Sequence, residues 1–333
     1  MVWSIVLVLA SFPLLLGGAV LFTNSVEWLG ARLGLGHGPI GSVLAAVATA
    51  LPESVIPVVA ILAGEASGEI AVGAIIGAPF LLGTLGMAVV GLSALVFRKR
   101  RERDAVLRLD RRATRRDLLV FLPMMSVAVV LGLVGTNAVR VVAAVLLVLG
   151  YLAYAGWTVA RGRGAEQDDD LRRLYFDHRR EEPRTALVWT QAVAGVALVV
   201  GGAELFVTEV EALATAVGVP ALALALVLAP LASELPEKLN SVLWVRRDKD
   251  TLALGNITGA MVFQSAIPVA VGLAFTEWRL PAPALVAACC ALVGATLCLA
   301  VTRGRSPRFS SVPMAGWLVL YLGTVVYVIV GTT

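Results

Sequence analysis

Long apolar stretches, separated by short polar and charged segments, recur along the whole chain. Most of them hold about 20 residues, the length that an α-helix needs to cross a hydrocarbon core of about 30 Å. The sequence lacks the short alternating segments that are typical of membrane β-barrels. The pattern predicts an all-α membrane protein with about ten transmembrane helices, over residues 2–24, 38–64, 69–97, 117–135, 138–160, 185–208, 218–245, 250–275, 281–302 and 312–331.

The composition agrees with this interpretation. Of the 333 residues, 59% are hydrophobic and 15% are charged, whereas soluble globular chains carry about 25% charged residues. The chain begins with Met1-Val2-Trp3-Ser4 and lacks the basic start of a secretory signal, so the first apolar stretch is expected to be a retained helix. Cys289, Cys290 and Cys298 share one apolar stretch and are expected to be buried as small hydrophobic residues.

Basic residues are distributed unevenly among the loops. Of the 27 Lys and Arg residues, all except Arg140, Arg279 and Lys238 lie in the loops that follow the odd-numbered helices. By the positive-inside rule these loops face the cytoplasm, which predicts a multi-pass protein of the cell membrane with both termini outside. Segments 98–116 and 161–184 are then cytoplasmic, the first as a topology signal near lipid headgroups and the second as a polar linker. The formal charge of +4 is confined to loops, so no nucleic-acid partner is expected.

The chain also contains an internal repeat. An offset of 184 residues aligns Gly17-Gly18-Ala19 with Gly201-Gly202-Ala203, and Leu51-Pro52-Glu53 with Leu235-Pro236-Glu237. An offset smaller by two residues aligns segment 73–78 with segment 255–260. Each half holds five predicted helices, and an odd number inverts the second half relative to the first. We therefore expect two inverted five-helix repeats, residues 1–160 and 185–333, joined by the linker 161–184.

Glu53 and Glu237 lie deep in apolar stretches, each directly after a proline. A charged group at the centre of a bilayer costs about 2.5–3.5 kcal/mol or more, so such an acid marks a functional site. Proline removes a backbone donor and disturbs the preceding helical turn, which leaves carbonyl groups without a partner. These carbonyls, the carboxylates and the hydroxyls of Thr49 and Ser233 are hard oxygen ligands that suit Ca²⁺ or Na⁺.

These features together resemble the sodium/calcium exchanger family of cation antiporters, in a divergent prokaryotic-type form. Each half has a (Thr/Ser)-x-x-Pro-Glu turn followed by a Gly-x-x-x-Gly helix. The resemblance implies that Thr49, Glu53, Ser233 and Glu237 ligate the exchanged cation, with Glu53 and Glu237 as its metal-binding carboxylates. It further implies that small inorganic cations are the substrates, within a lipid environment. No cofactor is expected besides the transported cation, for which Ca²⁺ exchanged against Na⁺ or H⁺ is the family precedent.

The sequence departs from the family pattern Gly-Asn-x-x-Gly-Ser-Asn-x-x-Asn in the helix after each turn. The first copy, residues 73–82, has no polar side chain, whereas the second keeps Asn256 and has Gln264 at the last position. Asn256 and Gln264 are therefore secondary ion-site candidates. Glu234 and Lys238 flank Glu237 with the i,i+4 spacing of a helical ion pair. They form either a simple neutralising pair, or a pair in which Lys238 stands in for one bound cation.

Glu204 lies one helix before the second turn and has three interpretations. It is an acid that contacts the ion ligands rather than the ion, a residue of the ion pathway, or a group near the surface that Lys238 neutralises. The function predicted from the whole pattern is secondary antiport with alternating access around two intramembrane glutamates, driven by Na⁺ or H⁺. The Gly-rich first and sixth helices are expected to slide against the other helices.

Three other functions compete with this prediction. One is a proton-coupled antiporter for a cation other than Ca²⁺, and another is a transport-inactive scaffold or sensor of the same fold. The third, an intramembrane enzyme, is disfavoured because the sequence has no His-Glu-x-x-His motif, and no Ser/His pair or paired Asp motif in the apolar stretches.

Overall fold

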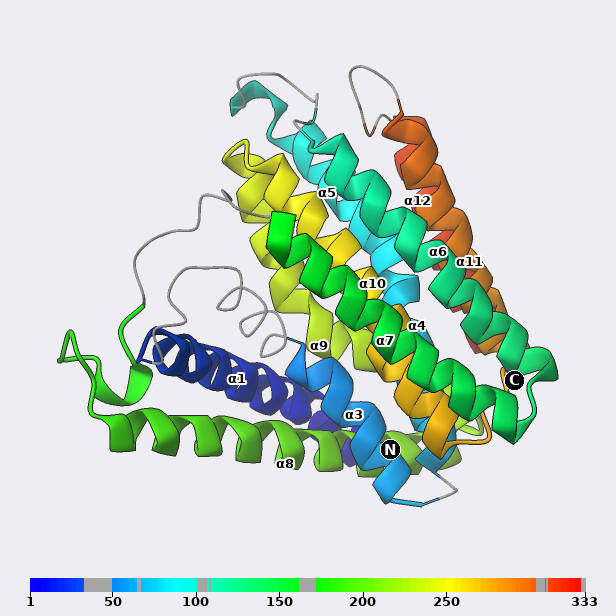
Figure 1. Ribbon diagram of the computed structural model, residues 1–333. Helices are drawn as coiled ribbons and strands as arrows, with labels where there is room; N and C mark the ends of the chain where they lie inside the picture. Colours follow the sequence, from blue (N-terminus) through cyan, green and yellow to red (C-terminus); the bar gives the residue numbers. More distant parts are fainter. Residues whose placement is uncertain are drawn as a thin grey trace.

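A computed structural model describes most of the chain (Figure 1). The described residues are 1–32, 50–64, 67–100, 107, 109–161, 172–303, 309 and 311–330. All regular secondary structure in these residues is helical. Among them, eight helices are long and apolar enough to span a membrane, and two shorter apolar segments, Leu51–Leu62 and Ala221–Glu234, accompany them. The predicted all-α membrane fold is confirmed.

The helices follow the order of the predicted spans. The first half contains α1 (Val2–Arg32), α3 (Leu51–Leu62), α4 (Gly68–Leu81), the π-helical turn η2 (Leu82–Gly86), α5 (Met87–Val96), the short η3 (Arg98–Arg100), α6 (Arg111–Val134) and α7 (Asn137–Arg161). The linker contains the short η4 (Tyr175–Asp177). The second half contains α8 (Thr185–Val217), α9 (Ala221–Arg246), α10 (Asp250–Phe275), α11 (Ala282–Val301) and α12 (Ser311–Val330).

Helices α1 and α8, the first of each half, lie side by side along one edge of the bundle (Figure 1). A Cβ atom on Gly18 would lie 2.7 Å from the carbonyl oxygen of Gly195, and one on Gly202 would lie 3.1 Å from the backbone nitrogen of Leu15. Residue numbers rise along one helix as they fall along the other, so the pair is antiparallel. Equivalent helices that run in opposite directions are what an inverted repeat requires.

Helices α4 and α9 run parallel, again with glycines at the contact. Gly73 lies against the backbone of Leu222, and Gly77 lies against the backbone of Leu226, four residues further along each helix. Small residues at such positions let two helix backbones approach closely, which is a common way of packing helices in membranes. The third helix of one half and the second helix of the other run in the same direction only if the second half is inverted.

The centre of the bundle is formed by α4, η2 and α5 of the first half and by α10 of the second half. Every residue of α4 from Ile70 to Leu81 is buried. Phe80 stacks on Tyr321 of α12 with ring centroids 5.4 Å apart, and Trp278 donates a hydrogen bond to the Ala128 carbonyl of α6 at 2.9 Å. The helices that carry the motifs after each turn therefore occupy the core.

Three boundaries differ from the sequence prediction. Helices α1 and α8 are longer than the predicted spans and extend to Arg32 and Val217. Gly218 then ends α8 in the left-handed conformation, with φ of 71°. Helix α6 begins inside the segment predicted as a loop, because the Asp110 side chain accepts hydrogen bonds from the backbone nitrogens of Arg112 and Ala113 and caps the helix.

Candidate functional site

Glu53 is a buried acid at the start of a helix. It lies in the first turn of α3 and is 7% exposed. Pro52 precedes it at a position where the missing N–H has no intrahelical acceptor to lose. The unpaired N–H groups of a first turn favour a negative charge nearby, which offsets part of the cost of burying the carboxylate. Thr49, its predicted partner ligand, lies outside the described residues.

The second turn has a different backbone from the first. Helix α9 runs without a break from Ala221 to Arg246, so the predicted disturbance before Pro236 is not a break in the helix. Pro236 still has no N–H to donate, which leaves the Ala232 carbonyl without its usual intrahelical donor. Ser233 is buried and its hydroxyl donates to the Ala229 carbonyl at 3.2 Å, so its oxygen keeps lone pairs for another partner.

Glu237 belongs to α9, but its side chain lies outside the part of the chain that the structure describes. The convergence of Glu53 and Glu237 across the interface between the halves therefore stays a prediction. Within the described residues, no group of three or more His, Cys, Asp and Glu side chains is arranged to hold a metal ion.

Glu234, Lys238 and Gln264 form a polar cluster inside the bundle. The Lys238 ammonium lies 3.1 Å from Oε2 of Glu234, so the predicted i,i+4 ion pair is confirmed. The Gln264 amide, from α10, donates a hydrogen bond to Oε1 of the same carboxylate. The exposed fractions are 0% for Glu234, 6% for Lys238 and 2% for Gln264. Both carboxylate oxygens of Glu234 are thus occupied by groups of the protein itself.

The other two candidates lie apart from this cluster. Asn256 of α10 is half-buried, and its amide nitrogen is buried without a partner among the described residues. Glu204 is exposed on α8. Lys238 forms its ion pair with Glu234, and the three interpretations of Glu204 stay predictions.

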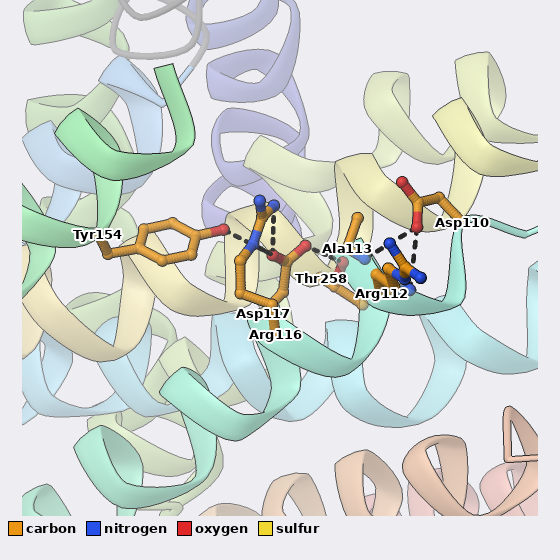
Figure 2. A network of polar contacts seen from close by, with 7 residues as sticks. All are labelled: Asp110, Arg112, Ala113, Arg116, Asp117, Tyr154 and Thr258. Atoms are coloured by element: carbon orange, nitrogen blue, oxygen red, sulfur yellow. Dashed lines mark hydrogen bonds and ion pairs between the residues drawn. The ribbon is translucent and has the colours of Figure 1, made fainter. Parts of the chain in front are cut away.

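A second polar hub, which the sequence interpretation missed, is centred on Asp117 of α6 (Figure 2). Its carboxylate accepts hydrogen bonds from the hydroxyls of Tyr154 of α7 and Thr258 of α10, both at 2.8 Å, and from Nε of Arg116 at 2.9 Å. The Arg116 guanidinium lies over the rings of Tyr154 and Trp157, 5.5 and 5.4 Å from their centroids. Asp117 is 3% exposed, so the hub ties α6 and α7 to α10 from inside the bundle.

The Asp117 hub fixes one face of the candidate ion-site helix. Thr258 stands two residues after Asn256 and one before Gly259, within the segment that matches residues 73–78 of the first half. Besides the adjacent Arg116, the Asp117 partners Tyr154 and Thr258 are 37 and 141 residues away in the chain. The available sequence signal was an acid, a tyrosine and a threonine in separate apolar stretches, and spacing alone does not pair such residues.

A third hub joins the linker to α1 and α8. Gln191 of α8 is fully buried, and its amide nitrogen lies 3.0 Å from each of three oxygens of α1, those of Leu21, Asn24 and Ser25. Its amide oxygen accepts a hydrogen bond from the Phe176 backbone at 2.9 Å. The described part of the linker therefore packs on the α1–α8 pair, and one side chain holds all three segments together.

Comparisons with known proteins agree with this architecture. The family model described as "Sodium/calcium exchanger protein" matches residues 3–160 and 187–329. "Uncharacterized membrane protein MJ0091" of Methanocaldococcus jannaschii is 27% identical over 263 residues, which cover 79% of this chain and 78% of that protein. "Putative antiporter CaxA" of Alkalimonas amylolytica is 26% identical over 180 residues, which cover 52% of this chain and 56% of that protein.

A solved structure with a similar fold is that of the H⁺/Ca²⁺ exchanger CAX. It superimposes with a TM-score of 0.74 at 18% identity, over 98% of this chain and 82% of that one. At this identity the likeness concerns the fold alone. The predicted resemblance to the exchanger family is confirmed by the family match, which covers both halves of the chain.

Proposed function

Because the chain belongs to the sodium/calcium exchanger protein family, we propose that it is a secondary active antiporter of small cations. The observation that carries this proposal is Glu53, an acid that is 7% exposed at the start of a helix inside an apolar bundle. An acid inside an apolar membrane bundle is costly and marks a functional site by default.

The proposed binding site lies between the two turns. Glu53 and Glu237 supply the carboxylates, while Thr49 and Ser233 supply hydroxyl oxygens. Oxygen ligands of this kind suit Ca²⁺, which takes six to eight of them in flexible geometries. The location between inverted repeats is where secondary transporters hold their substrates.

Alternating access is proposed to come from the α1–α8 pair. The two backbones approach closely at Gly18, Gly195 and Gly202, and Phe12 packs on Phe206 beside them with ring centroids 6.5 Å apart. The Gln191 hub ties α1 to α8 with three polar contacts. The pair is therefore built to move as one body against the remaining helices.

The driving ion is proposed to be Na⁺ or H⁺. The family description names sodium, and the printed name of the similar structure CAX names H⁺. The loss of polar side chains from residues 73–82 removes expected Na⁺ ligands from the first half, which favours proton coupling or a smaller number of Na⁺ ions.

The proposal is tested by flux measurements on the purified full-length protein in proteoliposomes. We expect uptake of ⁴⁵Ca²⁺ that is driven by an imposed Na⁺ or pH gradient and that is abolished in Glu53→Gln. The matched control is Glu277→Gln, the same acid-to-amide change at a side chain that is 78% exposed. Absence of counter-transport with both gradients in the unmodified protein would rule out Ca²⁺ antiport.

The same experiment separates the competing functions. An antiporter for another cation gives flux that competes with that cation and is lost in Glu53→Gln. A transport-inactive scaffold or sensor gives no flux with any cation, and cation binding measured by calorimetry then decides whether it senses ions. The apolar helix α4 is the feature that favours this second candidate, because it offers no polar side chain from Gly73 to Leu82.

A further inference from the structure

We propose that the ammonium group of Lys238 is a built-in cation, which fills a position that an exchanged monovalent cation would otherwise take. Glu234 is the ligand of this position through Oε2, and Gln264 holds Oε1 of the same carboxylate. The inference rests on the proposed antiport function for its meaning, and it goes further by assigning a specificity role to three residues. It predicts that the unmodified protein exchanges one monovalent ion fewer per cycle than a variant with an uncharged residue at position 238.

The first argument is the pairing of charge at Glu234. Its carboxylate is fully buried, with Oε2 at 3.1 Å from the Lys238 ammonium and Oε1 accepting from the Gln264 amide. A buried carboxylate without a positive partner is strongly disfavoured, so this acid requires a cation at Oε2. The protein supplies that cation covalently, from four residues along the same helix.

The second argument is the chemistry of the position. The group that faces it is a carboxylate oxygen, a hard donor of the kind that binds Na⁺ and Ca²⁺. The Gln264 amide nitrogen holds the other oxygen of the same carboxylate. The Gln264 side chain is 98% buried, and its amide oxygen has no hydrogen-bond partner among the described residues. That buried oxygen is a second observation, independent of the ion pair: the amide bonded to Glu234 keeps a hard oxygen donor without a hydrogen-bond partner among the described residues.

The third argument comes from the internal repeat. The ion pair and the amide have no counterpart in the first half, where the offsets that align the turns and the following helices place Ala50, Ser54 and Leu82. The Ser54 hydroxyl donates to the Ala50 carbonyl at 3.0 Å, within its own helix. Acid, lysine and amide thus occur together in one half and are all missing from the other, as expected for residues that work as one unit.

The charges support the same conclusion. With Lys238 protonated, the ion pair adds no net charge to the site, so Glu53 and Glu237 alone set the charge that a transported cation meets. A mobile Na⁺ at Oε2 of Glu234 would give the same electrostatic balance, and would also have to be released and rebound in each cycle. A tethered ammonium removes that ion from the exchange.

The test measures binding of ²²Na⁺ to the purified full-length protein, with choline as the replacing cation. Lys238→Met removes the ammonium and keeps most of the side-chain volume. We expect it to gain one saturable Na⁺ site per protein over the unmodified chain. The double variant Glu234→Gln/Lys238→Met carries no charge at the cluster and is expected to lose this gain. Lys238→Arg keeps a cation in place and is expected to bind no additional Na⁺.

The control is Lys99→Met, the same substitution at an exposed lysine beyond the end of α5. Lys238→Met leaves Glu234 buried without its partner, so folding in choline is weakened and Na⁺ is expected to restore it. The proposal is overturned if folded Lys238→Met binds no more Na⁺ than the unmodified protein, or if the double variant retains the gain. The proposal is also contradicted if Lys238→Met fails to fold to the same extent in Na⁺ and in choline while the double variant folds.

Equilibrium binding does not require transport, so this test separates the inference from the proposed function. A Na⁺ gain in Lys238→Met, together with no cation flux in the unmodified protein, upholds the cation position and refutes antiport. Flux that depends on Glu53, together with no Na⁺ gain, upholds antiport and refutes the built-in cation.

Discussion

The two halves of the chain place equivalent helices at the centre of the bundle but hold them by different means. In the first half, α4 is buried over its whole length from Ile70 and contacts its neighbours through apolar side chains and glycines. In the second half, α10 carries Thr258 and Gln264, which bond to acids of α6 and α9. Their counterparts in the first half are Ile76 and Leu82, both fully buried and apolar.

The difference teaches that the repeat preserves shape rather than chemistry. In the first half, Glu53 is the acid of the turn at the start of α3. Helix α4, which packs by shape alone, has no charged residue after Glu69. In the second half, α9 itself carries a second acid, Glu234, and a fixed cation, Lys238, and Gln264 of α10 bonds to the acid. Under the proposed antiport, the first half would exchange a cation, and the second half would hold the Lys238 ammonium as its own.

The largest difference between the halves is expected when one charge of the Glu234–Lys238 pair is removed. Glu234→Gln leaves the Lys238 ammonium buried without its carboxylate, and we expect the free energy of unfolding to fall by about 3–5 kcal/mol. Thermal unfolding in detergent measures the loss. In the first half, Ser54→Ala removes only a bond within one helix and should cost less than about 1 kcal/mol.

The double variant Glu234→Gln/Lys238→Met is the reference for this prediction. Because it removes both charges, it should recover most of the stability that Glu234→Gln loses. If Glu234→Gln and Ser54→Ala lower the free energy of unfolding equally, the ion pair adds no stability beyond a hydrogen bond within one helix. The two halves would then not differ in the way described.

A smaller effect is expected at the contact between α1 and α8. A Cβ on Gly18 would lie 2.7 Å from the Gly195 carbonyl oxygen, while nothing lies within 4 Å of one on Gly17. Gly18→Ala should therefore destabilise the protein by about 1–3 kcal/mol through overpacking and slow the proposed exchange.

Gly17→Ala is the matched control for the contact, one residue away on the same helix, and should leave both the unfolding temperature and the flux unchanged. Gly202→Ala should fall between the two, since a Cβ there would lie 3.1 Å from its nearest neighbours. If Gly17→Ala destabilised the protein most and Gly18→Ala least, these glycines would not determine how closely α1 and α8 pack.

The smallest effect is expected at the Asp117 hub. Asp117→Asn removes the negative charge that pairs with Arg116 and keeps one oxygen for Tyr154 or Thr258. We expect a loss of about 1–2 kcal/mol, since each hydrogen bond contributes about 1 kcal/mol and the Arg116 side chain is partly exposed. Ile76 of α4 is the counterpart of Thr258 in the first half, so Ile76→Val is the apolar comparison in the thermal measurement. A larger loss of stability in Ile76→Val than in Asp117→Asn would reverse the expected order.

Much of the fold was predictable from the sequence. Apolar length and loop charge gave the spans, and the aligned glycines, prolines and glutamates gave the inverted repeat, because both depend on local spacing. The Glu234–Lys238 pair was predicted for the same reason, since i,i+4 residues share one face of a helix. The orientation of the termini and the division at residues 160 and 185 stay predictions.

Contacts between distant segments were not predictable. Gln264 lies 30 residues after Glu234, and Gln191 contacts α1 across about 170 residues. Spacing carries no signal for such pairs, so the sequence indicated Gln264 only as a secondary ion-site candidate and did not single out Gln191. The proline at 236 was expected to disturb α9, but the helix continues through it, since a proline removes one hydrogen bond and need not end a helix that its neighbours support.

The most direct test of the central claim is the number of monovalent ions exchanged per Ca²⁺, obtained from the reversal potential of flux in proteoliposomes. The unmodified protein and Lys238→Met are compared under the same gradient. If the Lys238 ammonium stands in for an exchanged cation, Lys238→Met should couple one additional monovalent ion to each Ca²⁺. An unchanged stoichiometry in a variant that still transports would contradict the claim.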